Sequence, residues 1–347
     1  MKLKICLLFF LLAKINSAHA QKAFIINDFM KGYTLYFVRH TAGSETKEYY
    51  KLTENTSKKA VLEYGSKELS VSQISKTAKT AAFKSIPDSN IRILGDVNFD
   101  GRQDIIIHET EINDEGCYSP LATSLIFVNT TTAFVVSQSI SEVYNDAYCM
   151  RGGSFEINTK SKRLITSASG GAALHAFAYY SVSGTEAKLL SSFEEDGFDT
   201  FPFSKITGKK LENNKLVPFT SLSIYEPELD KVLSFNTKNG KGRVLLFKVE
   251  NILYYAFQQN DEYKFISFAH PSSAAKSGKA VFKFRKKNTV YELEFNSGNI
   301  KYLLYETPNG TGIKITVNGK ISDWQGLAKK GSLSGLINSK LLNVTKE

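Results

Sequence analysis

A period of two in the apolar pattern constrains this chain more than any other feature of its sequence. Short segments rich in β-branched and aromatic residues are separated by Gly, Asn, Ser and Asp clusters, which is typical of strands joined by turns. In the first half these segments are Tyr33–Val38, Asp104–His108, Ser124–Val128, Ala133–Ser137, Ser154–Ile157 and Ala176–Val182. In the second half they are Arg243–Val249, Ile252–Phe257, Glu262–Phe268, Lys279–Arg285, Val290–Phe295, Lys301–Tyr305 and Gly312–Val317. The sequence therefore predicts a mainly β protein.

Three Asn-Gly pairs predict hairpin turns in the second half, because both residues tolerate the positive φ angles of a type I′ turn. The pairs are Asn239-Gly240, Asn309-Gly310 and Asn318-Gly319. No segment shows a sustained apolar stripe at helical spacing, so we expect only short helices, around Ser66–Ala82 or Leu327–Leu342.

The charge is distributed unevenly and indicates two domains. Residues 21–200 carry 18 Lys and Arg against 22 Asp and Glu, whereas residues 201–347 carry 23 against 12. We place a first β domain, propeller-like or sandwich, at residues 21–201, a linker at 202–221 and a basic β-rich domain at 222–347. A basic half suits polyanions or acidic partners. Nucleic acid is not an expected partner, because no nucleic-acid recognition module appears.

The first twenty residues are typical of a signal peptide. Lys2 and Lys4 precede the apolar run Ile5–Ala13, and Ala18-His19-Ala20 forms a small-x-small cleavage site before Gln21. The run is too short for a membrane-spanning helix, which needs about 20 apolar residues, and no other stretch approaches that length. We therefore predict a periplasmic or secreted protein, cleaved near Ala20-Gln21, without a transmembrane segment.

After cleavage two cysteines remain, Cys117 and Cys149. Exported proteins meet an oxidising compartment, and two thiols without further partners suit one disulfide better than a metal site. We predict a Cys117–Cys149 disulfide.

The one motif with specific spacing is the loop from Asp96 to Asp104, with the sequence D-V-N-F-D-G-R-Q-D. Oxygen-bearing side chains stand at loop positions 1, 3, 5 and 9, and Gly101 permits a sharp turn. Calcium takes six to eight oxygen ligands, and such alternating carboxylates supply them. Position 12 is Ile107 instead of Glu, which excludes an EF-hand. The predicted ligands of a structural Ca²⁺ are Asp96, Asn98, Asp100, the carbonyl of Arg102 by analogy with EF-hand loops, and Asp104.

This loop, with strand-like residues on both sides, resembles the calcium loops of FG-GAP and VCBS-type β repeats, D-x-[DN]-x-D-G-x-x-D. Over residues 85–195 the chain is more loosely similar to periplasmic immunity proteins, which inhibit lysozyme-like toxins by plugging the active-site cleft. The similarity rests on the calcium loop together with Gly152–Ile157 and Ser167–Tyr180. Inhibitors of animal-type lysozymes insert a Ser-Gly-x-x-Tyr loop, whereas Ala173 stands here in place of the tyrosine. The resemblance implies partner contacts at Ser169, Gly170, Gly171, His175 and Tyr180; a plain turn between two strands is the alternative.

The sequence does not predict an enzyme. The histidines of the mature chain never occur at metal-ligand spacing, and neither a nucleophile elbow nor a P-loop is present. The acidic residues within 194–199 could pair for glycoside hydrolysis, but a solvated turn accounts for them equally well.

Two functions follow as predictions. The first is an exported calcium-binding β protein that acts as an immunity or inhibitor protein against a peptidoglycan-degrading, lysozyme-like effector. The alternative is a general periplasmic or surface β-module that binds a glycan or an envelope protein through its basic half.

Overall fold

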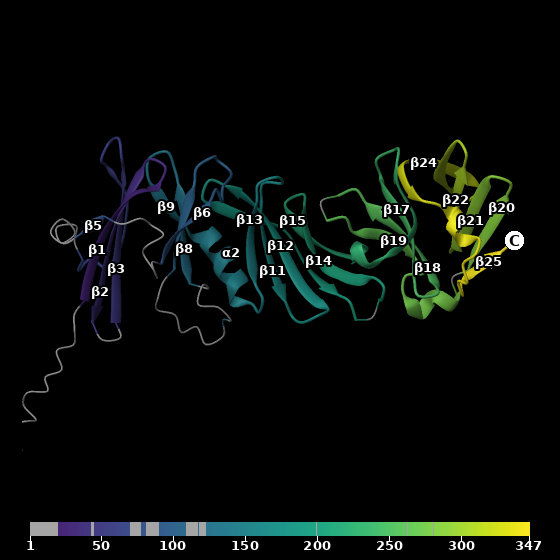
Figure 1. Ribbon diagram of the computed structural model, residues 1–347, viewed down its shortest axis with the longest axis horizontal. Coiled ribbons are helices and arrows are strands. Elements are labelled where there is room, and N and C mark those ends of the chain that lie inside the picture. Colours follow the sequence, from purple (N-terminus) through teal and green to yellow (C-terminus); the bar gives the residue numbers. More distant parts are fainter. Residues whose placement is uncertain are drawn as a thin grey trace, which may run out of the picture. The chain divides into compact units, whose positions relative to one another are not determined.

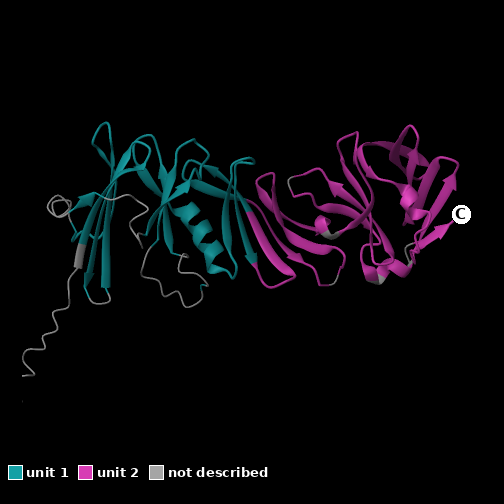
Figure 2. Ribbon diagram, viewed as in Figure 1, with its two compact units in different colours: residues 1–168, 179–189 teal, residues 169–178, 190–347 magenta. Residues whose placement is uncertain are grey.

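The computed structural model describes residues 20–42, 45–69, 78–80, 90–108, 117, 123–198, 200–261, 263–279 and 281–347. The predicted signal peptide, except Ala20, and most of the predicted helix at residues 66–82 lie outside these ranges. The chain is mainly β, as predicted, and it divides into two compact units. Unit 1 comprises residues 1–168 and 179–189, and unit 2 comprises residues 169–178 and 190–347 (Figure 2).

The described part of unit 1 contains two separate sheets, mostly antiparallel, and the helix α2 (Figure 1). The five-stranded sheet has the order β4-β3-β2-β1-β5 and consists of β1 (Ala20–Met30), β2 (Tyr33–Ala42), β3 (Glu45–Glu54), β4 (Ala60–Gly65) and β5 (Lys79–Thr80), with β5 parallel to β1. The four-stranded sheet has the order β6-β7-β8-β9 and consists of β6 (Ile91–Gly95), β7 (Asp104–His108), β8 (Ser124–Asn129) and β9 (Phe134–Ser137). The helix α2 (Gln138–Cys149) and the hairpin of β10 (Ser154–Asn158) and β11 (Arg163–Ser169) follow.

The four-stranded sheet is buried on both faces. Ile105 and Ile107 belong to a core shared with the five-stranded sheet, whereas Ile106 packs in a second core with α2 and Leu164 of β11. Successive strand residues point to opposite faces, so the uninterrupted run Ile105–Ile107 supplies both cores. Of the two predicted architectures, these packed sheets correspond to a sandwich.

The helix α2 corrects our expectation that no apolar stripe at helical spacing exists. Its buried residues Ile140, Val143, Tyr144 and Ala147 follow the i, i+3, i+4, i+7 spacing of one helix face. Ser137 caps the helix, because its Oγ accepts a hydrogen bond from the Ile140 N–H at 3.1 Å. This apolar stripe is narrow, and polar residues lie between its members. The sequence pattern therefore did not distinguish it from the surrounding strand-like segments.

Two strands, β12 (Leu174–Ser183) and β13 (Glu186–Asp196), contribute residues to both units. Within unit 2, the strand order is β13-β14-β15-β19-β18-β17-β16-β24-β23-β22-β21-β20-β25. The remaining strands are β14 (Ser204–Glu212), β15 (Lys215–Ser223), β16 (Asp230–Thr237), β17 (Gly242–Val249), β18 (Ile252–Gln259), β19 (Ile266–His270), β20 (Phe282–Lys287), β21 (Val290–Ser297), β22 (Ile300–Thr307), β23 (Gly310–Val317), β24 (Lys320–Gly331) and β25 (Val344–Lys346). Short 3-10 helices lie at η3 (Glu226–Glu228), η4 (Ala274–Lys279) and η5 (Leu333–Leu336). A strand ending at Gly331 and a single 3-10 turn therefore replace the helix expected around residues 327–342.

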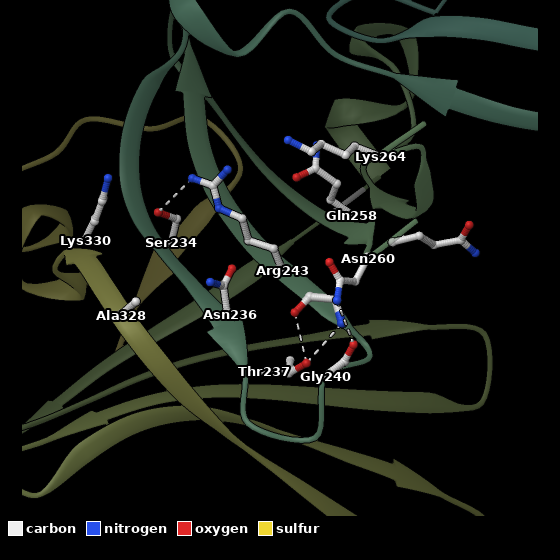
Figure 3. Close-up of a pocket in the computed structure, with 12 residues that line it drawn as sticks. Ser234, Asn236, Thr237, Gly240, Arg243, Gln258, Asn260, Lys264, Ala328 and Lys330 are labelled. Atoms are coloured by element: carbon white, nitrogen blue, oxygen red, sulfur yellow. Dashed lines mark hydrogen bonds between the residues drawn. The ribbon is translucent and has the colours of Figure 1, made fainter. Parts of the chain in front are cut away.

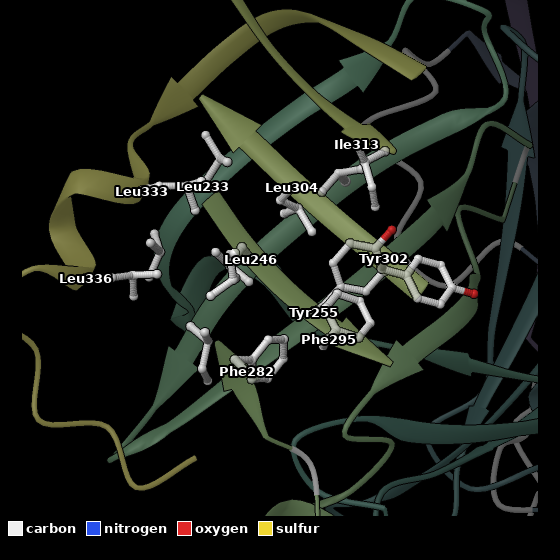
Figure 4. Close-up of a cluster of buried hydrophobic side chains, with 14 of the residues drawn as sticks. Leu233, Leu246, Tyr255, Phe282, Phe295, Tyr302, Leu304, Ile313, Leu333 and Leu336 are labelled. Atoms are coloured by element: carbon white, nitrogen blue, oxygen red, sulfur yellow. The ribbon is translucent and has the colours of Figure 1, made fainter. Parts of the chain in front are cut away.

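The strands β17 and β18 are the buried centre of unit 2. Leu246 and Tyr255 face a core that also contains Phe295 and Leu304 from the later strands, as Figure 4 shows. Phe247 and neighbouring residues on the opposite face form a second core. The main core also holds Trp324, the single tryptophan of the sequence, as a partly buried residue.

The segment that we predicted to be a linker, residues 202–221, lies inside unit 2 and forms most of the β14–β15 hairpin. The pairing runs without a shift from Ser204↔Ser223 to Glu212↔Lys215. Most residues of the hairpin are exposed, so its composition is polar like that of a linker. The turn at Asn213-Asn214 has two positive φ angles, 49° and 61°, as a type I′ turn requires.

The predicted Asn318-Gly319 turn joins β23 to β24 and also has positive φ angles at both residues. Asn239-Gly240 lies between β16 and β17, and Asn309-Gly310 lies where β22 gives way to β23, which begins at Gly310. In these two pairs only the glycines have positive φ angles.

Candidate functional site

The loop predicted to bind calcium connects β6 to β7 and is organised by its own carboxylates. Asp96 accepts hydrogen bonds from the backbone N–H groups of Asp100 at 3.0 Å and Gly101 at 2.8 Å. The φ angles of Phe99 and Gly101 are +62° and +89°, so the chain reverses sharply over these residues. Asn98 donates through Nδ2 to Asp100 Oδ2 at 3.0 Å.

The side chain of Arg102 is the part of this loop that the sequence pattern did not predict. Its guanidinium Nη2 lies 2.6 Å from Asp100 Oδ2, and its Nε donates to the Asn129 carbonyl at 2.8 Å. The loop pattern predicts only a carbonyl ligand at Arg102, but the side chain of this residue provides a counterion for Asp100.

Asp104 is buried at the start of β7. Its two carboxylate oxygens accept hydrogen bonds from the backbone N–H groups of Val97 at 2.8 Å and Asn129 at 2.7 Å, so it ties the loop to the end of β8. Burial raises the pKa of Asp104 to about 6, the two N–H donors oppose that rise, and the charges of Asp100 and Asp96 add to it.

The loop has the oxygen ligands that calcium prefers, but some of these oxygens already accept hydrogen bonds from other groups of the loop. Each carboxylate oxygen has further lone pairs for a cation, whereas Arg102 places a competing positive charge on Asp100. Across the part of the chain that the structure describes, no group of three or more His, Cys, Asp or Glu side chains is arranged to hold a metal ion. Calcium binding by this loop therefore remains a prediction.

The predicted disulfide is formed. Cys117 is bonded to Cys149, the last residue of α2, across a sequence separation of 32 residues. Among the described residues, no helix is both long and apolar enough to span a bilayer.

The residues expected to contact a partner lie at the end of β11, in the turn that follows it and on β12. Ser169, Gly170 and Gly171 begin the turn between β11 and β12, in which the Ser169 Oγ donates to the Gly171 carbonyl at 3.0 Å and the Gly170 N–H donates to the Leu174 carbonyl at 2.9 Å. Tyr180 is half-buried against the α2 core of unit 1, and burial, followed by the charge of Asp146, raises its pKa. His175 belongs to unit 2, so the two side chains fall in different units.

Unit 2 contains a groove that the sequence analysis did not predict. We call it the aromatic–basic groove; its volume is about 1130 Å³. The lining residues are Thr200, Lys205, Lys210, Phe219, Thr220, Ser221, Leu222, Gln259, Asp261, Tyr263, Phe265, Ile266, Ser267, Phe268, Ala269, Ser272, Ser273 and Lys276. Among these described residues are four aromatic rings and three lysines, and the one carboxylate among them is that of Asp261.

The rings of the groove form a packed cluster. Phe265 lies 5.2 Å from Tyr263 and 5.7 Å from Phe219, measured between ring centroids. Lys210 Nζ stands 5.9 Å from the centre of the Phe219 ring, a cation–π contact.

Gly208 allows Phe193, on the strand next to it, to pack against Phe219 of the groove. It pairs with Phe193 on one neighbouring strand and with Phe219 on the other. A Cβ at Gly208 would meet the Ser192 carbonyl oxygen at 2.2 Å and the Phe193 Cβ at 2.5 Å. Because glycine leaves this space open, the Phe193 and Phe219 rings meet edge to face at 6.4 Å.

No family model matches this chain, and no curated protein matches it. Three solved structures show distant similarity. A type IV secretion system related protein from Xanthomonas has a TM-score of 0.31 and 19% identity over 55% of this chain and 82% of that one. TolB from Acinetobacter baumannii has a TM-score of 0.17 and 11% identity over 86% of this chain and 81% of that one. The complex of NanB with Optactamide has a TM-score of 0.14 and 10% identity over 86% of this chain and 56% of that one. At these TM-scores none of them carries an argument about function.

Proposed function

We propose that this protein is an exported, non-enzymatic β protein that binds an anionic glycan of the cell envelope in the aromatic–basic groove of unit 2. The observation that carries the proposal is the composition of the groove. Flat rings suit the C–H faces of sugar rings, hydroxyl side chains suit their oxygens, and the lysines suit acidic substituents.

The charge supports an anionic ligand over a neutral one. Lys210 is paired with Glu212 at 2.8 Å, whereas Lys205 and Lys276 form no ion pair within the described ranges. Both are exposed at the groove, so their charge is available to a ligand.

Export is supported by two independent features. The disulfide Cys117–Cys149 favours an oxidising compartment, and the first twenty residues have the pattern of a signal peptide. In this proposal calcium, if bound by the loop from Asp96 to Asp104, stabilises unit 1 and takes no part in ligand binding.

Inhibition of a lysozyme-like effector remains a prediction with less support. The Ser169–Gly171 segment satisfies its hydrogen bonds within its own turn, and Tyr180 packs in the core of unit 1.

The test is co-sedimentation of the mature protein with peptidoglycan, teichoic acid and lipopolysaccharide fractions, at low and high salt. We expect binding to an acidic fraction, lost at high salt because the lysine charges are exposed. Phe219→Ala and the double substitution Lys205→Gln with Lys276→Gln should each weaken it. Lys320→Gln, an exposed lysine of β24 outside the groove, is the matched control.

Binding that survives high salt and the groove substitutions would contradict the proposal. Co-purification of a lysozyme-like enzyme, with no glycan bound, would favour the inhibitor function instead.

A further inference from the structure

A second cavity in unit 2 has a different chemical character from the groove. We call it the Arg243 pocket; it has a volume of about 540 Å³, within the roughly 300–1000 Å³ typical of small-molecule sites. Figure 3 shows its lining, which consists of Ser234, Asn236, Thr237, Gly240, Gly242, Arg243, Gln258, Gln259, Asn260, Lys264, Ala328 and Lys330. Apart from Ala328 and the two glycines, every described lining residue is polar, and none of the described ones is acidic.

Three cations converge on this pocket from three strands or turns. Arg243 lies at the start of β17, Lys264 precedes β19 and Lys330 lies near the end of β24. Lys264 and Lys330 are exposed, and neither forms an ion pair with a carboxylate that the structure describes. Among the described residues, therefore, no carboxylate neutralises these two of the three charges.

Arg243 is held in place from behind by Glu226. Its Nη1 lies 2.9 Å from Glu226 Oε1 and 3.0 Å from Oε2, while its Nη2 is 3.4 Å from Ser234 Oγ inside the pocket. Burial raises the pKa of Glu226, but Lys231 and Arg243 outweigh that effect and hold the pKa below its usual value. Glu226 is therefore ionised at neutral pH and fixes the guanidinium beside the pocket.

A β-bulge shapes the opposite wall. Ser234 pairs with Lys330 and Asn236 pairs with Leu327, so β24 has one residue more than β16 between these pairs. Ala328 in the bulge has a φ angle of +53°, a conformation that a non-glycine residue rarely adopts. Lys329 turns to Glu306, 2.6 Å away, while Lys330 lines the pocket.

From this arrangement we infer that the Arg243 pocket binds an acidic sugar, a monosaccharide or short glycan carrying a phosphate or carboxylate group. The cations pair with the acidic group. The exposed amides of Asn236 and Asn260 supply donors and acceptors for sugar hydroxyls. Thr237 is buried and bonded to the backbone of Gly242, so it shapes the wall of the pocket. The inference stands without the proposed ligand of the groove, although Gln259 lines both cavities.

The experiment is isothermal titration calorimetry on the mature full chain with glucose 6-phosphate, glucuronate, inorganic phosphate and glucose. We expect at least one acidic sugar to bind, glucose to give no measurable binding, and inorganic phosphate to bind more weakly than glucose 6-phosphate. The two sugar acids distinguish a phosphate from a carboxylate group.

The double substitution Lys264→Gln with Lys330→Gln should weaken binding at least tenfold, the equivalent of about 1.4 kcal/mol, because it removes two of the three cations that pair with the acidic group. Both lysines are exposed, so the variant should fold normally. Lys320→Gln should bind like the wild type. Phe219→Ala should also keep acidic-sugar binding, which separates this site from the groove.

The inference is overturned if neither sugar acid binds, or if the double variant binds them as tightly as the wild type. Equal affinity for inorganic phosphate and glucose 6-phosphate would show that the pocket recognises only the phosphate group, which would contradict the inference of a sugar site.

Discussion

The Arg102 guanidinium lies 2.6 Å from the Asp100 carboxylate, in the middle of the loop predicted to bind calcium. A dense group of carboxylates needs positive charge nearby, and here a side chain of the same loop supplies part of it. An ion bound by this loop would have to compete with that arginine.

Calcium should therefore bind more tightly to Arg102→Ala than to the wild type, and not to Asp100→Ala. Mass action predicts a stabilisation of about 2.7 kcal/mol when free calcium is a hundred times its dissociation constant. Thermal unfolding with calcium and with excess chelator measures it. If chelator leaves the wild type and Arg102→Ala unchanged, the loop does not bind calcium.

Glu226→Gln should strengthen acidic-sugar binding in the Arg243 pocket. The substitution removes the negative charge 2.9 Å from Arg243 and leaves the guanidinium to the ligand. We expect roughly fivefold tighter binding, the equivalent of about 1 kcal/mol for a partly exposed ion pair. Calorimetry with glucose 6-phosphate or glucuronate checks this, with Glu212→Gln as the matched control. Weaker binding would mean that Glu226 acts mainly by orienting Arg243.

His270 should make unit 2 sensitive to acid. Its ring stacks on Phe295 at 4.7 Å, its Nε2 is buried and has no hydrogen-bond partner within the described residues, and burial lowers its pKa. The folded state therefore holds this proton less tightly than the unfolded state. The stability it contributes is present above about pH 6.5 and is lost as the pH falls through the lowered folded pKa.

His270→Phe should reduce that loss, because phenylalanine keeps the ring packing and does not titrate. The measurement is urea unfolding between pH 5 and 8, followed by the fluorescence of Trp324, which packs in the same core. His175→Gln is the control. Parallel pH profiles for wild type and His270→Phe would show that His270 is not responsible.

Removal of the disulfide should destabilise unit 1 by about 2–4 kcal/mol, the range for a closed loop of this size. Cys117→Ser with Cys149→Ser should lower the unfolding temperature seen by circular dichroism. The Trp324 transition serves as an internal control, since this residue lies in unit 2. An equal shift of both signals would show that the two units unfold together.

The sequence by itself determined the β class, many strands and several turns. The runs Arg243–Val249 and Ile252–Phe257 nearly match β17 and β18, because β-branched and aromatic residues between turn formers favour strands wherever they occur. It also indicated the disulfide, since only two cysteines were left to pair. It missed α2 and took the polar β14–β15 hairpin for a linker, because an exposed hairpin and a linker share one composition.

Only the tertiary structure decided which side chains come together to line the two cavities. The Arg243 pocket needs Ser234 beside Lys330, and the aromatic–basic groove needs Phe219 beside Phe265. A period of two assigns each side chain to a face, but it does not say which strands become neighbours or where a bulge shifts the register. Strand pairing and register depend on the packing of core residues that are far apart in sequence. Both cavities could therefore be found only in the folded chain.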